Sequence, residues 1–146
     1  MYFDEEVVLD VRLNALDKYV DYFVIVESEF THSGDKRDLK FNHKKFEKFK
    51  NKIIYKVFNK PPKNLENIND NDSEEIKGNK YIINAIKREN GQRNLIDEGL
   101  YKAEKNDVIL ISDVDEIPDL SKIDFSKVTE KILMFRQDMF YYKFNL

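Results

Sequence analysis

Apolar residues along the chain alternate between the spacing of a helix and the unbroken pattern of a buried strand. Residues 5–19 place apolar side chains at intervals of three and four, which predicts an amphipathic helix. Residues 22–26 are aromatic or β-branched and contain no turn residue, which predicts a buried strand. The same criteria predict a polar loop at 30–41, a short helix at 43–50 with Phe46 and Phe49 inward, and a second strand at 52–58.

The second half of the chain continues this alternation. Residues 63–78 are polar with few apolar residues, which predicts a mobile loop. The remaining predicted elements are a helix at 79–105 interrupted or kinked near Asn90 and Gly91, a third strand at 107–112, a short helix at 120–127, and strands at 132–135 and 139–144. Helices and strands in this order predict a single α/β domain over residues 1–146, with a mostly parallel sheet flanked by helices.

Composition excludes several classes of protein. The chain has 146 residues and a formal net charge of −3, so we expect no nucleic-acid partner. It contains no cysteine, which excludes disulfides and thiolate metal sites. No apolar stretch is long enough for a membrane helix, and residues 1–6 do not resemble a signal peptide. We therefore expect a cytoplasmic chain without a membrane segment.

The clearest candidate chemistry follows the predicted strand at 107–112. Asp113 and Asp115 are two positions apart, so a continuing strand would direct both carboxylates to one face. Two carboxylates at the end of a parallel strand suit Mg²⁺ or Mn²⁺ and leave coordination positions for phosphate oxygens. The alternative is structural, because Asp and Glu also cap helices, and a short helix is predicted after Pro118.

Four segments resemble glycosyltransferase family 17, the family of the enzyme that adds bisecting N-acetylglucosamine (GlcNAc) to N-glycans. They are EVVLDVRLNAL at 6–16, DYFVIVES at 21–28, RENGQRN at 88–94 and DVILISDVDEIP at 107–118. The resemblance implies a GT-A fold, a UDP-GlcNAc donor, a saccharide acceptor and an inverting transfer. It also implies that Asp113 and Asp115 hold Mn²⁺ or Mg²⁺.

The predicted donor-binding residues are Glu27, Ser28, Arg93, Asn94 and Asp113. Glu27 and Ser28 lie at the carboxyl end of the first predicted strand. One interpretation is that a nucleotide packs there, and the alternative is that a polar strand end simply meets water. Arg93 suits a diphosphate because a guanidinium pairs with phosphate oxygens, although an ordinary pair with Asp97 is an equal alternative.

The chain departs from the family pattern at both ends. The family domain begins before Met1 and continues beyond Leu146, so we expect a domain that is incomplete at its C-terminus. The catalytic residue is unknown: an inverting transferase needs a general base, and Asp138 and Glu116 are the candidates in the sequence. A non-catalytic nucleotide-binding relic is therefore an alternative function, and a phosphohydrolase of the haloacid dehalogenase type is a less favoured one.

Overall fold

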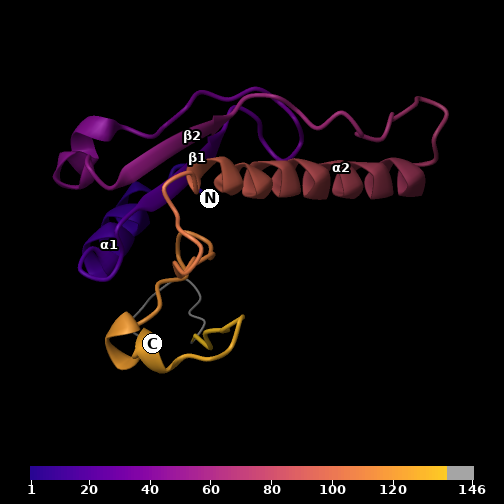
Figure 1. The fold of residues 1–146 in the computed structure, drawn as a ribbon. Helices are drawn as coiled ribbons and strands as arrows, with labels where there is room; N and C mark the ends of the chain where they lie inside the picture. Colours follow the sequence, from indigo (N-terminus) through magenta and orange to yellow (C-terminus); the bar gives the residue numbers. More distant parts are fainter. Residues whose placement is uncertain (138–146) are drawn as a thin grey trace, which may run out of the picture.

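The computed structural model describes residues 1–137 and shows helices packed around a small parallel sheet (Figure 1). The main helices and strands are α1 (Glu6–Leu16), β1 (Phe23–Ser28), β2 (Ile53–Phe58) and α2 (Glu74–Asn94). Four 3₁₀ segments complete the fold: η1 (His43–Phe49), η2 (Leu95–Gly99), η3 (Leu120–Lys122) and η4 (Phe125–Lys127). The α/β class predicted from the sequence is confirmed.

The sheet pairs β1 with β2 in parallel, in a register that runs from Phe23 opposite Ile53 to Ser28 opposite Phe58. At the other edge of β1, Tyr2 forms one parallel bridge with Glu27, and its amide donates to the Val26 carbonyl at 2.9 Å. The predicted strands at 22–26 and 52–58 are confirmed, as is their parallel direction. Parallel strands require a long crossover, and here η1 lies within it.

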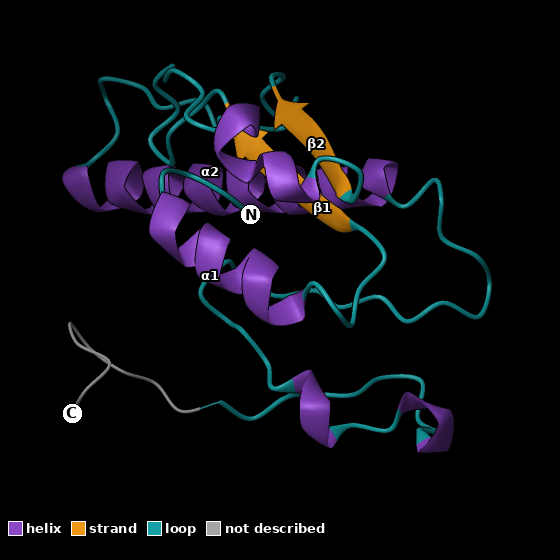
Figure 2. Ribbon diagram, turned by 90° about the vertical axis from the view of Figure 1, so that its left-hand side faces the viewer, coloured by secondary structure: helices purple, strands orange, loops and turns teal. Residues whose placement is uncertain are grey.

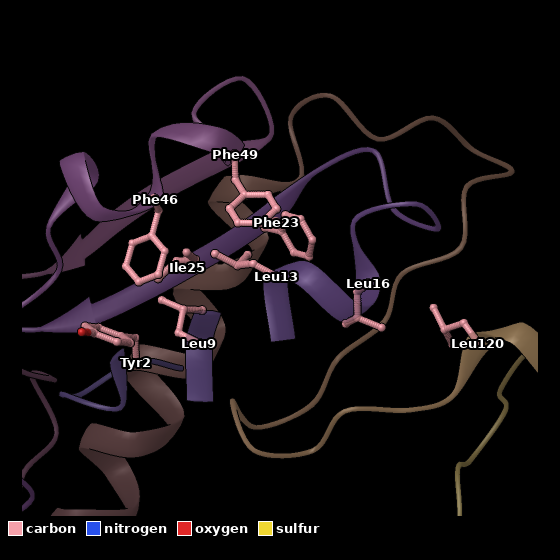
Figure 3. Packing of buried hydrophobic residues seen from close by; sticks show 9 residues of the cluster. All are labelled: Tyr2, Leu9, Leu13, Leu16, Phe23, Ile25, Phe46, Phe49 and Leu120. Carbon is pink, nitrogen blue, oxygen red and sulfur yellow. The ribbon is translucent and has the colours of Figure 1, made fainter. Parts of the chain in front are cut away.

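One face of the sheet packs on α1 and η1. Side chains alternate along a strand, so Phe23 and Ile25 share this face. Figure 3 shows both in a cluster of apolar side chains, most of which come from these two helical segments. The cluster consists of Tyr2, Leu9, Leu13, Leu16, Phe46, Phe49 and Leu120. The predicted inward positions of Phe46 and Phe49 are thereby confirmed.

The opposite face of the sheet packs on α2 and η2, so the sheet lies between two helical layers (Figure 2). The Gln92 side chain of α2 donates to the Val26 carbonyl at 3.1 Å. The helix predicted at 79–105 is present as α2 but ends at Asn94, and the predicted interruption near Asn90 and Gly91 is wrong because α2 is continuous there. Gly91 serves packing instead: a Cβ there would lie 2.8 Å from Cζ of Phe58.

The predicted third strand at 107–112 is also wrong, since this segment has no regular secondary structure. Within residues 1–137, no backbone hydrogen bond pairs 108–112 with another strand. A strand needs a neighbour for its backbone amides and carbonyls, and without one Val108 and Ile111 are 68% and 60% exposed. Apolar composition alone was therefore insufficient to make this strand.

The helix predicted at 120–127 and the two strands predicted after it have three different outcomes. Residues 120–127 form two 3₁₀ turns, η3 and η4, which the Asp119 and Asp124 side chains cap. Residues 132–135 are irregular, so the strand predicted there is wrong. The strand predicted at 139–144 lies outside the described residues.

Candidate functional site: the acidic turn

Asp113 and Asp115 lie on a tight turn, not on a strand. The Glu116 amide donates to the Asp113 carbonyl at 3.2 Å, and the Asp113 amide donates to Oε2 of Glu116 at 3.0 Å. Oγ of Ser112 adds a hydrogen bond to the Glu116 carbonyl at 3.2 Å. We call residues 112–116 the acidic turn. The prediction that both aspartates share one face of a strand is therefore wrong, because the turn begins where the strand was expected to continue.

Arg12 of α1 binds the acidic turn across more than a hundred residues of sequence. Its Nη1 donates to the carbonyls of Asp113 and Glu116, both at 2.8 Å, and its Nη2 donates to Oγ of Ser112 at 2.7 Å. The sequence prediction did not assign Arg12 to the site. A signal was present, because Arg12 stands between Leu9 and Leu13, close to the buried stripe of the helix.

Arg93 approaches the same turn from the last turn of α2. Its Nη2 lies 3.2 Å from Oδ1 of Asp113 and 3.2 Å from Oε1 of Glu89. The structure thus brings together two predicted donor-binding residues, and among residues 1–137 Arg93 pairs with Glu89 and Asp113 and not with Asp97. Both side chains stay accessible, with exposures of 38% for Arg93 and 49% for Asp113. The neighbouring Asn94 is exposed.

Charge is concentrated at this turn. Burial lowers the pKa of the Arg12 guanidinium from its usual value, and the carboxylates of Glu116, Asp113 and Asp115 oppose that shift. All three carboxylates are therefore close enough to attract the Arg12 guanidinium electrostatically. Asp115 and Glu116 are exposed, so a positively charged ligand can reach the turn from solvent.

The acidic turn offers two aspartate carboxylates to a cation. Across residues 1–137, no three His, Cys, Asp or Glu side chains group together as a metal site. Two carboxylates are nevertheless a common protein contribution to Mg²⁺ in phosphate sites, where substrate oxygens and water complete the coordination. Asp113 and Asp115 fit that limited role, and their assignment as metal ligands stays a prediction.

Glu27 and Ser28 lie in a different environment from the acidic turn. The Glu27 carboxylate is fully buried and accepts the amides of Lys40 and Phe41 at 2.6 and 3.0 Å and the Tyr55 hydroxyl at 2.8 Å. Arg37 lies 3.4 Å from it. Within the described part of the chain, the Ser28 hydroxyl forms hydrogen bonds only with the backbone of Phe30. The geometry gives Glu27 an internal role, and donor contact by these two residues stays a prediction.

The Tyr55 hydroxyl provides a test of this buried network. Burial and the Glu27 carboxylate raise the pKa of Tyr55 above its ordinary value of 10.0. Folding therefore favours the neutral phenol, and its stabilisation is complete below about pH 10 and declines as pH rises further. Urea unfolding between pH 8 and 11 should show a shallower alkaline loss of stability for Tyr55→Phe than for wild type. An exposed control, Tyr101→Phe, should keep the wild-type slope; equal slopes for both variants would contradict the prediction.

The fold defines an α/β protein with parallel strands, a class that includes many nucleotide-binding proteins. The family model described as glycosyltransferase family 17 matches residues 1–146, and the chain belongs to this family. Membership shows a glycosyltransferase, which in general uses a sugar donor and an acceptor, and it removes support for the haloacid dehalogenase alternative. No curated protein and no solved structure was found to match the chain. Within the described part of the chain, no helix has the length and apolar character needed to cross a membrane.

Proposed function

We propose that the acidic turn binds the diphosphate of UDP-GlcNAc together with Mn²⁺ or Mg²⁺, in a GT-A-type fold that transfers GlcNAc with inversion to a saccharide acceptor. The contact between Arg93 and Asp113 at 3.2 Å carries this proposal. A cation–diphosphate pair offers the complementary charges: the cation suits the carboxylate, and phosphate oxygens suit the guanidinium. Both side chains are accessible enough to exchange their mutual contact for the ligand.

Each residue at the acidic turn has a separate role in this proposal. Asp113 and Asp115 hold the cation, which as a Lewis acid stabilises the leaving diphosphate when it is bound. Arg93 binds phosphate oxygens, and the exposed Asn94 beside it contributes a further polar contact to the donor. Arg12 takes no direct part in donor binding, because the acceptors of its hydrogen bonds among residues 1–137 all lie in the turn.

One observation favours a second candidate, a non-catalytic nucleotide-binding domain. An inverting transfer needs a carboxylate that is free to take a proton from the acceptor hydroxyl. Glu116, one of two candidates, uses its carboxylate to accept the Asp113 amide at 3.0 Å. The other candidate, Asp138, lies outside the described residues. No general base is assigned, and the two candidate functions differ only in turnover.

Calorimetric titration with UDP-GlcNAc, with and without Mn²⁺, tests the proposal. We expect wild type to bind the donor only with the cation. Asp115→Ala should lose at least about 10- to 100-fold in affinity, since that loss is typical even for a group that only orients a metal ligand. Asp70→Ala is the matched control, because Asp70 is exposed in the loop before α2. It should bind as wild type does.

Absence of donor binding by the folded wild-type chain with either cation would contradict the proposal. Equal affinity of Asp115→Ala and wild type would contradict the role of the acidic turn. If binding is metal-dependent, release of UDP in the presence and absence of a mannose-bearing acceptor then separates the two candidates. Acceptor-dependent release indicates transfer, whereas binding without release indicates the non-catalytic domain.

A further inference from the structure

Arg12 and Arg93 contact the acidic turn in different ways. Within residues 1–137, the three hydrogen bonds of Arg12 go to two main-chain carbonyls and one hydroxyl, and none goes to a carboxylate oxygen. Arg93, by contrast, meets the Asp113 side chain. One arginine therefore fixes the backbone of the turn, while the other faces the group that is predicted to bind ligand.

We propose that Arg12 is a positioning residue, which fixes the acidic turn to α1 so that the Asp113 and Asp115 carboxylates are held ready for a cation–diphosphate ligand. The cation and donor part of this inference rests on the proposed function. The positioning itself rests on the three hydrogen bonds of Arg12, which connect α1 to a segment without regular secondary structure.

The position of α1 explains why this connection can orient the turn. Leu9 and Leu13 flank Arg12 and are 3% and 0% exposed in the core cluster. The helix is thereby fixed against the sheet, as the buried leucines in Figure 3 show. Other contacts also hold the turn, since Val114 packs against the core cluster and Arg93 contacts the Asp113 side chain. Backbone pairing does not add to them, because residues 108–112 pair with no strand among the described residues. Among these contacts, Arg12 is the one that joins the main chain of the turn to α1 by hydrogen bonds.

The contacts also explain why arginine is needed. A planar guanidinium has five N–H donors in a fixed fork, so it can serve several acceptors with little loss of side-chain freedom. A lysine ammonium keeps the charge but has a single donor centre on a flexible chain. Arg12→Lys therefore preserves the local charge and removes the multipoint geometry, which separates positioning from simple electrostatic attraction.

Hydrogen–deuterium exchange by mass spectrometry on the full chain tests the positioning directly. The Asp113 and Glu116 amides are hydrogen-bonded within the turn, so peptides covering 112–116 should exchange faster in Arg12→Lys than in wild type. Peptides covering β1 should exchange as before. Arg136→Lys, at an exposed arginine, is the matched control and should leave both regions unchanged.

Affinity for UDP-GlcNAc with Mn²⁺ provides the second measurement. Arg12→Lys should weaken it by about 10- to 100-fold, the usual effect of losing a group that orients metal ligands. Ser112→Ala removes one of the three Arg12 contacts and should produce a smaller change in the same direction. If Arg12→Lys does not fold, donor affinity can still be compared between Ser112→Ala and wild type.

Three results would overturn the inference. Unchanged exchange at 112–116 would show that Arg12 does not hold the turn. Equally accelerated exchange in β1 and in the turn would show a general structural role. Faster exchange in the turn with unchanged donor affinity would show that the position of the turn does not matter for binding. If wild type binds no donor, the proposed function fails separately, and the exchange comparison alone decides whether Arg12 holds the turn.

Discussion

Glu27→Ala is expected to lower the free energy of unfolding by about 3–5 kcal/mol, because it removes one partner of a buried ion pair. Arg37, the other partner, has a side chain only 9% exposed. The substitution also leaves the amides of Lys40 and Phe41 and the Tyr55 hydroxyl without their acceptor. Since domains are usually stable by about 5–15 kcal/mol, this is a large part of the total. Urea unfolding followed by circular dichroism measures the change.

Two further variants show whether burial is the cause. Glu47→Ala also removes one partner of an ion pair, with Lys50, but both of those side chains are exposed. It should cost at most about 1 kcal/mol. Glu27→Gln keeps the size of the side chain and one acceptor oxygen, so its stability should fall between wild type and Glu27→Ala. Similar values for Glu27→Ala and Glu47→Ala would contradict the buried-network interpretation.

Glu27 also illustrates how a correct observation about sequence can have a different physical meaning. A carboxylate at the end of a buried strand fits a ligand contact. In the structure the carboxylate accepts hydrogen bonds from the segment at 40–41 and from β2, which fixes the long connection between the strands. These partners are far from Glu27 in sequence, and two of them are backbone amides. Almost every residue has a backbone amide, so the sequence does not indicate which amides will donate to the Glu27 carboxylate.

The elements that the sequence predicted well are those stabilised by their own apolar side chains. The residues of α1, β1, η1 and β2 carry apolar side chains at the spacing of their element, and they pack on one another. The segment at 107–112 has an equally apolar run but no neighbouring strand among the described residues. A hydrophobic pattern predicts that the side chains of a segment are buried. A strand also requires a neighbouring strand that pairs with its backbone amides and carbonyls.

The start of α2 was missed although the sequence contains its signal. The polar stretch at 63–78 was predicted to be a loop throughout, but α2 begins at Glu74. Ser73 caps it by accepting the Ile76 amide, and two glutamates occupy its first turn. This is the usual composition of a helix N-terminus. Capping residues within a charged, low-hydrophobicity stretch were thus more informative than its overall polarity.

The sequence predicted part of the candidate site, namely the charged side chains at the ends of elements. Arg93 and Asp113 were both predicted to bind the donor, and the structure places them in contact at 3.2 Å. Charged side chains at element ends are visible in a sequence. The role of Arg12 was not predicted, because two of its three partners are main-chain carbonyls on a turn that replaced the expected strand. Its proximity to the buried stripe of α1 was the available clue.

Gly99→Ala is expected to destabilise the chain by about 1–3 kcal/mol, the usual cost of adding volume to a close contact. Gly99 is buried at the end of η2, against β1. A Cβ at this position would clash with Cγ1 of Val24 and lie 2.8 Å from its Cγ2. Val24 is β-branched and has few alternative rotamers, so η2 must move away from the sheet. Thermal or urea unfolding measures the loss.

The same substitution at Gly78 should have the opposite sign, which makes it a sharp control. Gly78 lies inside α2 with open space around its missing side chain, so Gly78→Ala should stabilise the chain by about 0.5–1 kcal/mol through helix propensity. Adding Val24→Ala to Gly99→Ala removes both clashing methyl groups and should recover part of the lost stability. A double-mutant cycle without coupling between the two positions would contradict the contact, because touching residues usually couple by about 0.5–3 kcal/mol.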